Sequence, residues 1–209
     1  MTIYILPFSA QDFDCLAPLL PFVSAGRRER IARMKNDTAK TASLLSALLV
    51  RMAVSERAGV PASELIFSAH EGGKPYCVGV PCEFSLSHTS GMIVCAVSDE
   101  PVGIDAELLR PAPMRVARRF TDAEREYISG SDERFFRVWT RKEAFGKMKG
   151  DGLSGGALGT DVLSHGFSAS ARTFRFGDHI ISACGSVSSV AAAAAAAEDI
   201  YEYFIQGEI

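Results

Sequence analysis

The sequence predicts an α+β fold with antiparallel strands flanked by helices, and three observations support that prediction. Segments rich in β-branched or alternating apolar residues, typical of strands, occupy 2–8, 83–98 and 101–108. A stripe of leucines at helical spacing predicts a long helix over 36–59, between an asparagine or aspartate N-cap and a glycine. Further helices are predicted over 121–149, after these strands and before others.

The remaining segments follow from the same kinds of pattern. Short basic helices are predicted at 24–34 and 114–120, and a strand–turn–strand unit at 65–76. Strands are also expected at 167–178, 179–185 and 200–205. The alanine run at 191–197 favours a helix by propensity, but so short a helix is marginal alone, so a mobile connection is an equal alternative.

Length and composition indicate a globular protein built as one domain or as two small halves. The order of elements changes near residue 100, so we expect the halves to be 1–100 and 101–209. The net charge of −3 gives no field that would attract nucleic acid. Five cysteines without metal-binding spacing indicate free thiols in a reducing compartment. Because no signal-peptide pattern or membrane-length apolar run is visible, we expect a cytoplasmic protein without membrane partners.

The stretch GIDAE predicts a pair of converging carboxylates. On a strand, Asp105 and Glu107 point to the same face, with α-carbons about 6.6 Å apart. Two such carboxylates suit a hard divalent cation such as Mg²⁺, which completes its shell with water and phosphate oxygens. The alternative is the solvent face of an edge strand, and the pattern alone does not separate the two.

The stretch WTRKEAFGKMKGDGL predicts a helix with a functional stripe. Trp139, Glu143 and Lys147 are spaced by four, so they share one face, and Lys142 sits beside it. Glu143 offers a third carboxylate and Lys147 a positive charge one turn further on, a pattern suited to neutralising a pyrophosphate. The GDGL that follows ends the helix and lets backbone approach a ligand. A solvated Glu–Lys pair is the alternative.

Three further features are candidates for contacting phosphate. His88 follows the alternating strand in FSLSHT, Lys74 lies on the GKP turn, and RRER spans 27–30. Each also has an ordinary interpretation, as a hydrogen-bonded turn residue, a solvated lysine or a solvated helix face. Alone, none of them indicates a site.

Taken together, these pieces resemble a known family. A basic helix, GKP, FSLSHT, GIDAE, FTDAE and WTRKEAFGKMKGDGL follow one another, an order similar to that of the Sfp-type 4′-phosphopantetheinyl transferases. That family's pattern reads GKP, FN(I/L)SHS, GIDIE, FxxxE and W(T/S)xKEAxxKxxGxGL. The resemblance covers about residues 20 to 155 with matching spacing, and its last two motifs together are specific. The length resembles the two-half type, so a monomer is expected.

The resemblance implies the 4′-phosphopantetheinyl transferase fold, in which two similar α/β halves are related by a pseudo-two-fold axis and coenzyme A lies between them. It also implies a reaction. The 4′-phosphopantetheine group of coenzyme A moves to a serine of an apo acyl or peptidyl carrier protein, with Mg²⁺ as cofactor, and adenosine 3′,5′-bisphosphate leaves. Fatty-acid, polyketide and non-ribosomal peptide carriers all remain open.

By motif position, the resemblance gives a role to each candidate residue. Lys147 meets the pyrophosphate, and either Glu143 or a metal-bound water takes the proton of the serine. His88 is expected on the 3′-phosphate. The implied metal ligands are Asp105, Glu107 and Glu143. The implied coenzyme A contacts are Arg27, Arg30, Lys74, Ser87, His88, Lys142 and Lys147.

Three positions depart from the family pattern. Ala42 stands where an arginine is frequent, Ala106 replaces an isoleucine, and Thr89 replaces a serine. We expect either Lys40 to substitute for that arginine or the 3′-phosphate to be held less tightly. The alternative function is a catalytically degenerate module that only binds coenzyme A or a carrier protein. Such a module would be expected to lose a carboxylate or the lysine, and all of them are present.

A further hypothesis concerns the carrier protein. The stretch LLRPAPMRVARRF places four arginines just after GIDAE, and carrier proteins are generally acidic around their target serine. We expect Arg115 and Arg118, with Met114 and Phe120 as apolar anchors, to dock the carrier. A solvated basic helix is the alternative.

Overall fold

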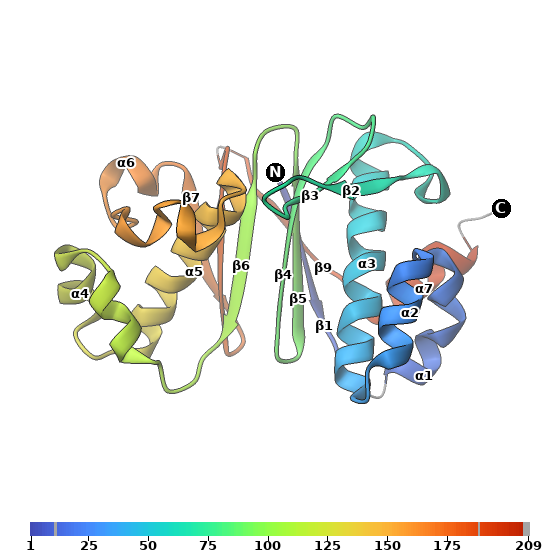
Figure 1. Ribbon diagram of the computed structural model, residues 1–209, viewed down its shortest axis with the longest axis horizontal. Helices are drawn as coiled ribbons and strands as arrows, with labels where there is room; N and C mark the ends of the chain where they lie inside the picture. The colour runs from blue at the N-terminus through green and yellow to red at the C-terminus, as the bar shows by residue number, and fades with distance from the viewer. Residues whose placement is uncertain (11, 188, 207–209) are drawn as a thin grey trace.

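The computed structural model describes residues 1–10, 12–187 and 189–206. Two sheets lie in the middle of the molecule, with helices on the outer side of each (Figure 1). The first sheet has the strand order β4–β5–β1–β9 and the second has the order β6–β8–β7. The strands are Thr2–Pro7 (β1), Phe67–Ala69 (β2), Pro75–Cys77 (β3), Glu83–Thr89 (β4), Met92–Ser98 (β5), Gly103–Leu108 (β6), Ala171–Phe176 (β7), His179–Cys184 (β8) and Ala191–Ala194 (β9).

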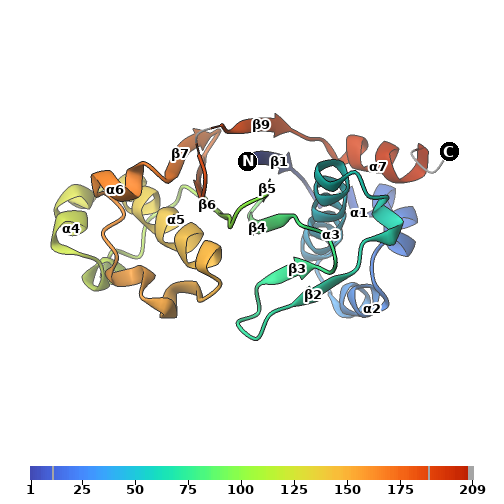
Figure 2. The ribbon, with the colours of Figure 1, turned by 90° about the horizontal axis from the view of Figure 1, so that it is seen from above.

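The two longest helices, α3 and α5, lie on opposite sides of the strands when the molecule is seen from above (Figure 2). The helices are Asp12–Leu16 (α1), Ala25–Arg33 (α2), Asp37–Ala58 (α3), Asp122–Ile128 (α4), Asp132–Lys149 (α5), His165–Ser168 (α6) and Ala197–Gln206 (α7). Short 3₁₀ turns are Ala17–Phe22 (η1), Ala62–Glu64 (η2), Met114–Arg119 (η3), Gly152–Gly155 (η4) and Ala157–Gly159 (η5). The predicted α+β class, with antiparallel strands flanked by helices, is confirmed.

The two sheets repeat one topology. In the first, β1 is followed by α3 and then by the hairpin β4–β5, whose second strand pairs with β1. In the second, β6 is followed by α5 and then by the hairpin β7–β8, whose second strand pairs with β6. The expected pair of similar halves is therefore visible in the order of elements, although the sequence shows no residue-level repeat.

Helix α3 forms where the leucine stripe predicts it. The Asn36 side chain caps its start by accepting a hydrogen bond from the Ala39 N–H, and Gly59 ends it with a φ of 66°. The stripe is fully buried and belongs to the core between α3 and the first sheet. A second core fills the space between the sheets, where Ile3 and Val94 of the first sheet meet residues of the second such as Ile104.

The end of the chain differs from the prediction, because 200–205 is not a strand. It belongs to helix α7, in which Ile200 and Phe204, one turn apart, are buried in the core beside α3. The alanine run is neither a helix nor a mobile connection over its first part, since Ala191–Ala194 form β9, parallel to β1. Hydrogen bonding along the open edge of β1 outweighs the helix propensity of alanine there.

Two other segments are shorter or tighter than expected. Within 167–178 the strand covers only β7, because α6 extends to Ser168, and the basic stretch near 114–120 is the 3₁₀ turn η3. Where the chain divides into halves stays a prediction, and the structure adds that β9 and α7 return to the first sheet and to α3. No described helix is both long and apolar enough to cross a membrane.

Candidate active site

Helix α5 crosses β6 at very short range. A Cβ atom on Gly103 would lie 1.9 Å from the carbonyl oxygen of Ala144, so only glycine fits at the start of β6. The Ser131 side chain caps the start of α5 by accepting a hydrogen bond from the Arg134 N–H, and Gly150 ends the helix with a φ of 84°. The close crossing brings the side chains of β6 within reach of the α5 stripe.

The α5 stripe and the β6 carboxylates meet as the two motifs predict. Trp139 Nε1 donates a hydrogen bond to Glu107 Oε1 at 3.2 Å. At the other end of the stripe, Lys147 Nζ donates a hydrogen bond to Asp105 Oδ1 at 2.7 Å. Glu143 lies between these two contacts on the helix. Trp139 and Lys147 are therefore hydrogen-bonded to β6, so the stripe is not a wholly solvated face.

The Asp105 carboxylate is buried, with 6% of the residue exposed. Its Oδ1 accepts hydrogen bonds from the Ser87 hydroxyl and the Lys147 ammonium, both at 2.7 Å. Its Oδ2 is also buried and has no hydrogen-bond partner among the described residues. Burial raises the pKa of Asp105, and the charge of Lys147 opposes that rise. A desolvated, unpartnered carboxylate oxygen suits a cation, so this atom fits a metal ligand.

Glu107 and Glu143 complete the set of carboxylates. Glu107 Oε2 accepts a hydrogen bond from Arg110 at 2.7 Å. Burial, and after it the charge of Asp105, raises the pKa of Glu143. Within the described ranges, no three acidic, histidine or cysteine side chains stand close enough to hold a metal ion together. The donor chemistry fits a hard divalent cation, and the side chains would have to turn toward it.

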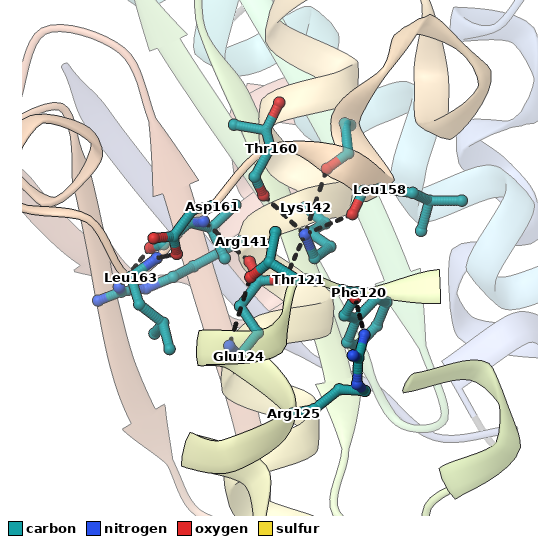
Figure 3. A network of polar contacts seen from close by, with 12 residues as sticks. Phe120, Thr121, Glu124, Arg125, Arg141, Lys142, Leu158, Thr160, Asp161 and Leu163 are labelled. Carbon is teal, nitrogen blue, oxygen red and sulfur yellow. Dashed lines mark hydrogen bonds and ion pairs between the residues drawn. The ribbon is translucent and has the colours of Figure 1, made fainter. Parts of the chain in front are cut away.

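Lys142 precedes Glu143 in the sequence, but its own contacts are with Glu124, Leu158 and Thr160 (Figure 3). Its side chain is 0% exposed, and its ammonium lies 2.8 Å from the equally buried carboxylate of Glu124. It also donates to the carbonyl oxygens of Leu158 and Thr160, at 2.8 and 2.7 Å. The structure therefore does not support the predicted contact of Lys142 with coenzyme A. Lys142 ties α5 to α4 and to the loop around η5 instead.

Glu124, the glutamate of FTDAE, belongs to a motif that the sequence singled out, but the motif assigned this residue no structural role. Its Oε2 accepts from the Thr121 N–H at 2.9 Å, which completes a capping box, and its Oε1 accepts from the Val162 N–H at 2.9 Å. The TDAE stretch signals the cap, since an acid stands three residues after the threonine. Nothing local signals that this carboxylate is buried against a lysine.

Two hollows lie beside β4, and the remaining predicted contacts surround them. The first, of about 320 Å³, is lined from both halves, by Lys74 on one side and Lys147 on the other. The second, of about 200 Å³, is lined by Arg27 of α2. Both share Phe84 and Leu86 of β4, so the hollows adjoin. A larger hollow of about 990 Å³ lies among η1, η2 and α7, and none of its lining residues belongs to the carboxylate cluster.

The charged side chains around the two hollows differ in their burial and in their contacts with the rest of the protein. The Lys74 ammonium lies 3.1 Å from Glu83 and donates to the Met148 carbonyl at 3.2 Å. Arg27 is half-buried, and burial, together with the charge of Arg30, lowers its pKa. The positive charges of Arg27 and Arg30 suit an anion. His88 is exposed on β4.

The substitute proposed for the missing arginine is already engaged. The Lys40 ammonium lies 2.7 Å from Asp37 and rests over the Phe13 ring, 5.2 Å from its centre. Ala42 is buried in α3. Lys40 therefore has protein partners in this structure, and both alternatives for the 3′-phosphate stay predictions.

Two family models match the chain on either side of residue 100. A model described as 4′-phosphopantetheinyl transferase, N-terminal, matches residues 9–100, and one described as the 4′-phosphopantetheinyl transferase superfamily matches residues 101–197. A 4′-phosphopantetheinyl transferase of Bacillus subtilis is 32% identical over 155 residues, covering 71% of this chain and 68% of the relative. The chain belongs to the 4′-phosphopantetheinyl transferase family.

Further relatives of this transferase extend the match. The 4′-phosphopantetheinyl transferase psf-1 of Bacillus pumilus is 37% identical over 145 residues, covering 66% of this chain and 62% of the relative. The 4′-phosphopantetheinyl transferase HetI of Nostoc is 38% identical over 110 residues, covering 46% of each chain. The family and the enzyme class that the motifs predict are confirmed. The metal, the residue roles, the oligomeric state and the compartment stay predictions.

Proposed function

We propose that this transferase moves the 4′-phosphopantetheine group of coenzyme A to a serine hydroxyl of an apo acyl or peptidyl carrier protein and releases adenosine 3′,5′-bisphosphate. The observation that carries the proposal is the meeting of two motifs in space. The β6 carboxylates of Asp105 and Glu107 contact the α5 stripe at Lys147 and Trp139, so acid groups and a lysine converge beside a hollow shared by both halves.

In this proposal Asp105, Glu107 and Glu143 would hold Mg²⁺. The support is chemical, since all three offer carboxylate oxygens and Oδ2 of Asp105 has no hydrogen-bond partner among the described residues. When bound, the ion supplies positive charge to the phosphate oxygens of coenzyme A.

Lys147 supplies positive charge from the protein itself. In the transfer, the serine oxygen forms a bond to the phosphorus that carries pantetheine, and that phosphorus loses its bond to the oxygen bridging the two phosphates. The electrons of the broken bond stay on the leaving bisphosphate. Because Lys147 lines the hollow between the halves, its ammonium is placed to stabilise that charge.

Glu143 is the candidate base for the serine proton. A hydroxyl is a weak nucleophile, and a carboxylate with a raised pKa is a better proton acceptor than an exposed one. Burial and Asp105 raise the pKa of Glu143 in this direction. The proton passes to Glu143 directly or through one water.

The nucleotide end of coenzyme A would lie along β4. Arg27 and Arg30 would bind its phosphate groups at the smaller hollow, with His88 on the 3′-phosphate and Lys74 in the wall of the larger hollow. Ser87 would act through Asp105, to which its hydroxyl donates. Nothing in this arrangement requires Lys142.

The carrier protein would dock on η3. Arg115 and Arg118 are exposed there and offer positive charge to an acidic partner. Phe120 is only 3% exposed, so it supports the turn from below and is not an anchor for the carrier. We also propose a monomer that acts in the cytoplasm, because one chain supplies every site residue and its cysteines are free thiols.

The test is the intact mass of an apo carrier protein after incubation with this protein, coenzyme A and Mg²⁺. Fatty-acid, polyketide and peptide carriers are offered separately, each with an EDTA control. A gain of one phosphopantetheine group that EDTA abolishes is the expected result. If no carrier gains mass while coenzyme A still binds by calorimetry, the chain is a binding module without activity and the proposal is wrong.

A further inference from the structure

The face of the first sheet that meets the second sheet changes character at its edge strand. On β1 and β5 this face is apolar and forms the core between the sheets. On β4 the residues in register with that apolar face are Ser85, Ser87 and Thr89, which we call the hydroxyl row. Ser85 and Ser87 are buried, with 5% and 8% of each residue exposed. Buried hydroxyls at the border of an apolar core need partners.

The two ends of the hydroxyl row bond to the backbone of β6. The Ser85 hydroxyl accepts a hydrogen bond from the Ile104 N–H at 3.0 Å. The Thr89 hydroxyl accepts one from the Leu108 N–H at 3.4 Å. Both N–H groups lie four residues apart on the same edge of the strand, so the row spans nearly the whole of β6.

The middle of the row bonds to a side chain. The Ser87 hydroxyl donates to Oδ1 of Asp105 at 2.7 Å, in a buried contact. Asp105 directly follows the anchored Ile104 on β6. Strand β4 of the first half therefore holds β6, which carries the proposed metal ligands Asp105 and Glu107, near both ends. Between those ends β4 also hydrogen-bonds the carboxylate of Asp105.

These side-chain contacts stand where a sheet would have backbone hydrogen bonds. β4 is the edge of the first sheet and pairs with β5, while β6 is the edge of the second sheet and pairs with β8. The two edges run side by side in the centre of the molecule (Figure 1). An edge strand presents unpaired N–H groups, and here serine and threonine oxygens take the place of carbonyl oxygens for two of them.

Further polar contacts join the two halves beyond both ends of the hydroxyl row. At one end, the Lys74 ammonium of the first half donates to the carbonyl oxygens of Val102 and Met148, at 3.4 and 3.2 Å. At the other, His179 Nε2 of β8 lies 2.9 Å from the carbonyl oxygen of Ser90, in the turn after β4. Polar side-chain contacts between the halves therefore continue past both ends of the row.

This arrangement fixes one register between the halves. An apolar contact alone tolerates small sliding, because one methyl group is much like another. Sliding β6 along β4 by one residue would separate the row from its partners and leave buried polar groups unsatisfied, which is strongly disfavoured.

We propose that the hydroxyl row sets the position of β6, and with it Asp105, relative to the first half, so that Ser85 and Thr89 are positioning residues for the transfer reaction. This inference rests on the proposed function for its catalytic part. Coenzyme A would contact the first half along β4 and react beside β6, so the distance between those strands decides whether the phosphates meet Lys147 and the carboxylates. A misplacement near 1 Å is enough to lower a rate by about 100-fold.

The experiment uses full-length protein with Ser85→Ala, Thr89→Val and the double variant. Thr89→Val keeps the shape of the side chain and removes only its hydroxyl, and Thr89→Ser restores a hydroxyl. Backbone amide hydrogen exchange, followed by NMR, reads the row without reference to activity. We expect exchange at the Ile104 amide to quicken about fivefold or more in Ser85→Ala, and at the Leu108 amide in Thr89→Val.

Kinetics with coenzyme A and an apo acyl carrier protein then test positioning. We expect kcat to fall about tenfold in the double variant, KM for the carrier to change little, and Thr89→Ser to retain the parent kcat. The matched control is Ser55→Ala, which removes a buried hydroxyl far from β6 that donates to the Val60 carbonyl and accepts from the Tyr203 hydroxyl of α7. That variant should lose stability and leave kcat and both amides unchanged.

The two layers of the proposal fail separately. Unchanged exchange at both amides would show that the row does not hold β6, whatever the protein catalyses. Faster exchange with an unchanged kcat would show that the row holds β6 but does not position the reaction. If the parent protein transfers nothing to any carrier while exchange responds as expected, the proposed function is wrong and the structural role of the row stands.

Discussion

The ammonium of Lys147 lies 2.7 Å from Oδ1 of Asp105, and this ion pair joins α5 to β6 at the centre of the candidate site. The aspartate side chain is 8% exposed and the lysine 29%, so the pair is held on one side and open on the other. Lys147 thus lies between a buried carboxylate and the hollow shared by the halves. A phosphate entering that hollow would meet a lysine already fixed in direction.

Replacing Lys147 with methionine should lower kcat for phosphopantetheine transfer by about 100-fold or more, because charge on the leaving bisphosphate would lose a lysine that lines the hollow. The measurement is single-turnover transfer to an apo carrier protein. Lys149→Met is the matched control, since Lys149 is 43% exposed and lies 3.9 Å from Asp151. Equal rates in the two variants would contradict a role for Lys147.

Replacing Lys142 with methionine should destabilise the protein by about 3–5 kcal/mol, because the buried Glu124 carboxylate would lose its counter-charge. Denaturant unfolding of the variant checks the size of the loss. Adding Glu124→Gln should recover part of it, since the orphaned charge is then removed. If Lys142→Met is as stable as the parent but cannot bind coenzyme A, the original interpretation of Lys142 as a ligand contact is restored.

Acid should weaken both Mg²⁺ activation and the rate at a higher pH than ordinary glutamates would allow. Burial and Asp105 raise the pKa of Glu143, so its carboxylate takes up a proton above the usual value of about 4.3. A protonated carboxyl binds a cation poorly and accepts no proton. The measurement is the apparent Mg²⁺ affinity and kcat from pH 8 downward to about pH 5.

Ionisation of Glu143 should lower the stability of the folded protein, whereas the proposed reaction needs the ionised form. A raised folded-state pKa means that folding favours the protonated form, so the ionised form costs stability as the pH rises through that pKa. Glu143→Gln should therefore stabilise the protein near neutral pH and make no difference below the unfolded pKa. A stabilisation that is equal at both pH values would show that the shift is not real.

Reversing charge on η3 should raise KM for the carrier protein and leave KM for coenzyme A unchanged. Arg115→Glu/Arg118→Glu places repulsion where an acidic partner would dock, and an effect of about tenfold is expected at low salt. Arg33→Glu/Lys35→Glu makes the same change in charge on exposed residues of the first half. An equal rise in carrier KM in both variants would mean that net charge alone is responsible.

The side chains that meet between β6 and α5 were predictable because two short motifs each have one period. GIDAE on a strand places Asp105 and Glu107 on one face, and spacing by four places Glu143 and Lys147 on one helix stripe. What the spacing does not contain is the crossing of α5 over β6, which depends on the absence of a side chain at Gly103. The resemblance to a family supplied that step.

Lys142 was misassigned although the helical period contained a warning. Successive residues of a helix are about 100° apart, so Lys142 cannot share the direction of Glu143. It lies in line with Val138 and Gly146, four residues to either side, and all three are buried. That row belongs to the core, and a lysine within it requires a buried acid, which lies distant in sequence at Glu124.

The contacts of the hydroxyl row and the C-terminal helix could not be predicted from the sequence, for a different reason. Ser85, Ser87 and Thr89 alternate as the exposed face of any strand would, and only the neighbouring sheet gives them partners and buries the two serines. Likewise, 200–205 alternates in a way that suits a strand, but Ile200 and Phe204 also suit a helix. Tertiary contacts, which no local pattern records, decide both cases.

Because β9 pairs with β1, the first sheet can be completed only after residues late in the chain have been synthesised. The Met1 carbonyl accepts a hydrogen bond from the Ala191 N–H at 3.2 Å, and the two strands run parallel from there. When only residues 1–100 have emerged from the ribosome, the β1 edge of the first sheet is still unpaired and can pair with strands of other molecules. Splitting the chain at its midpoint for complementation would create the same exposed edge.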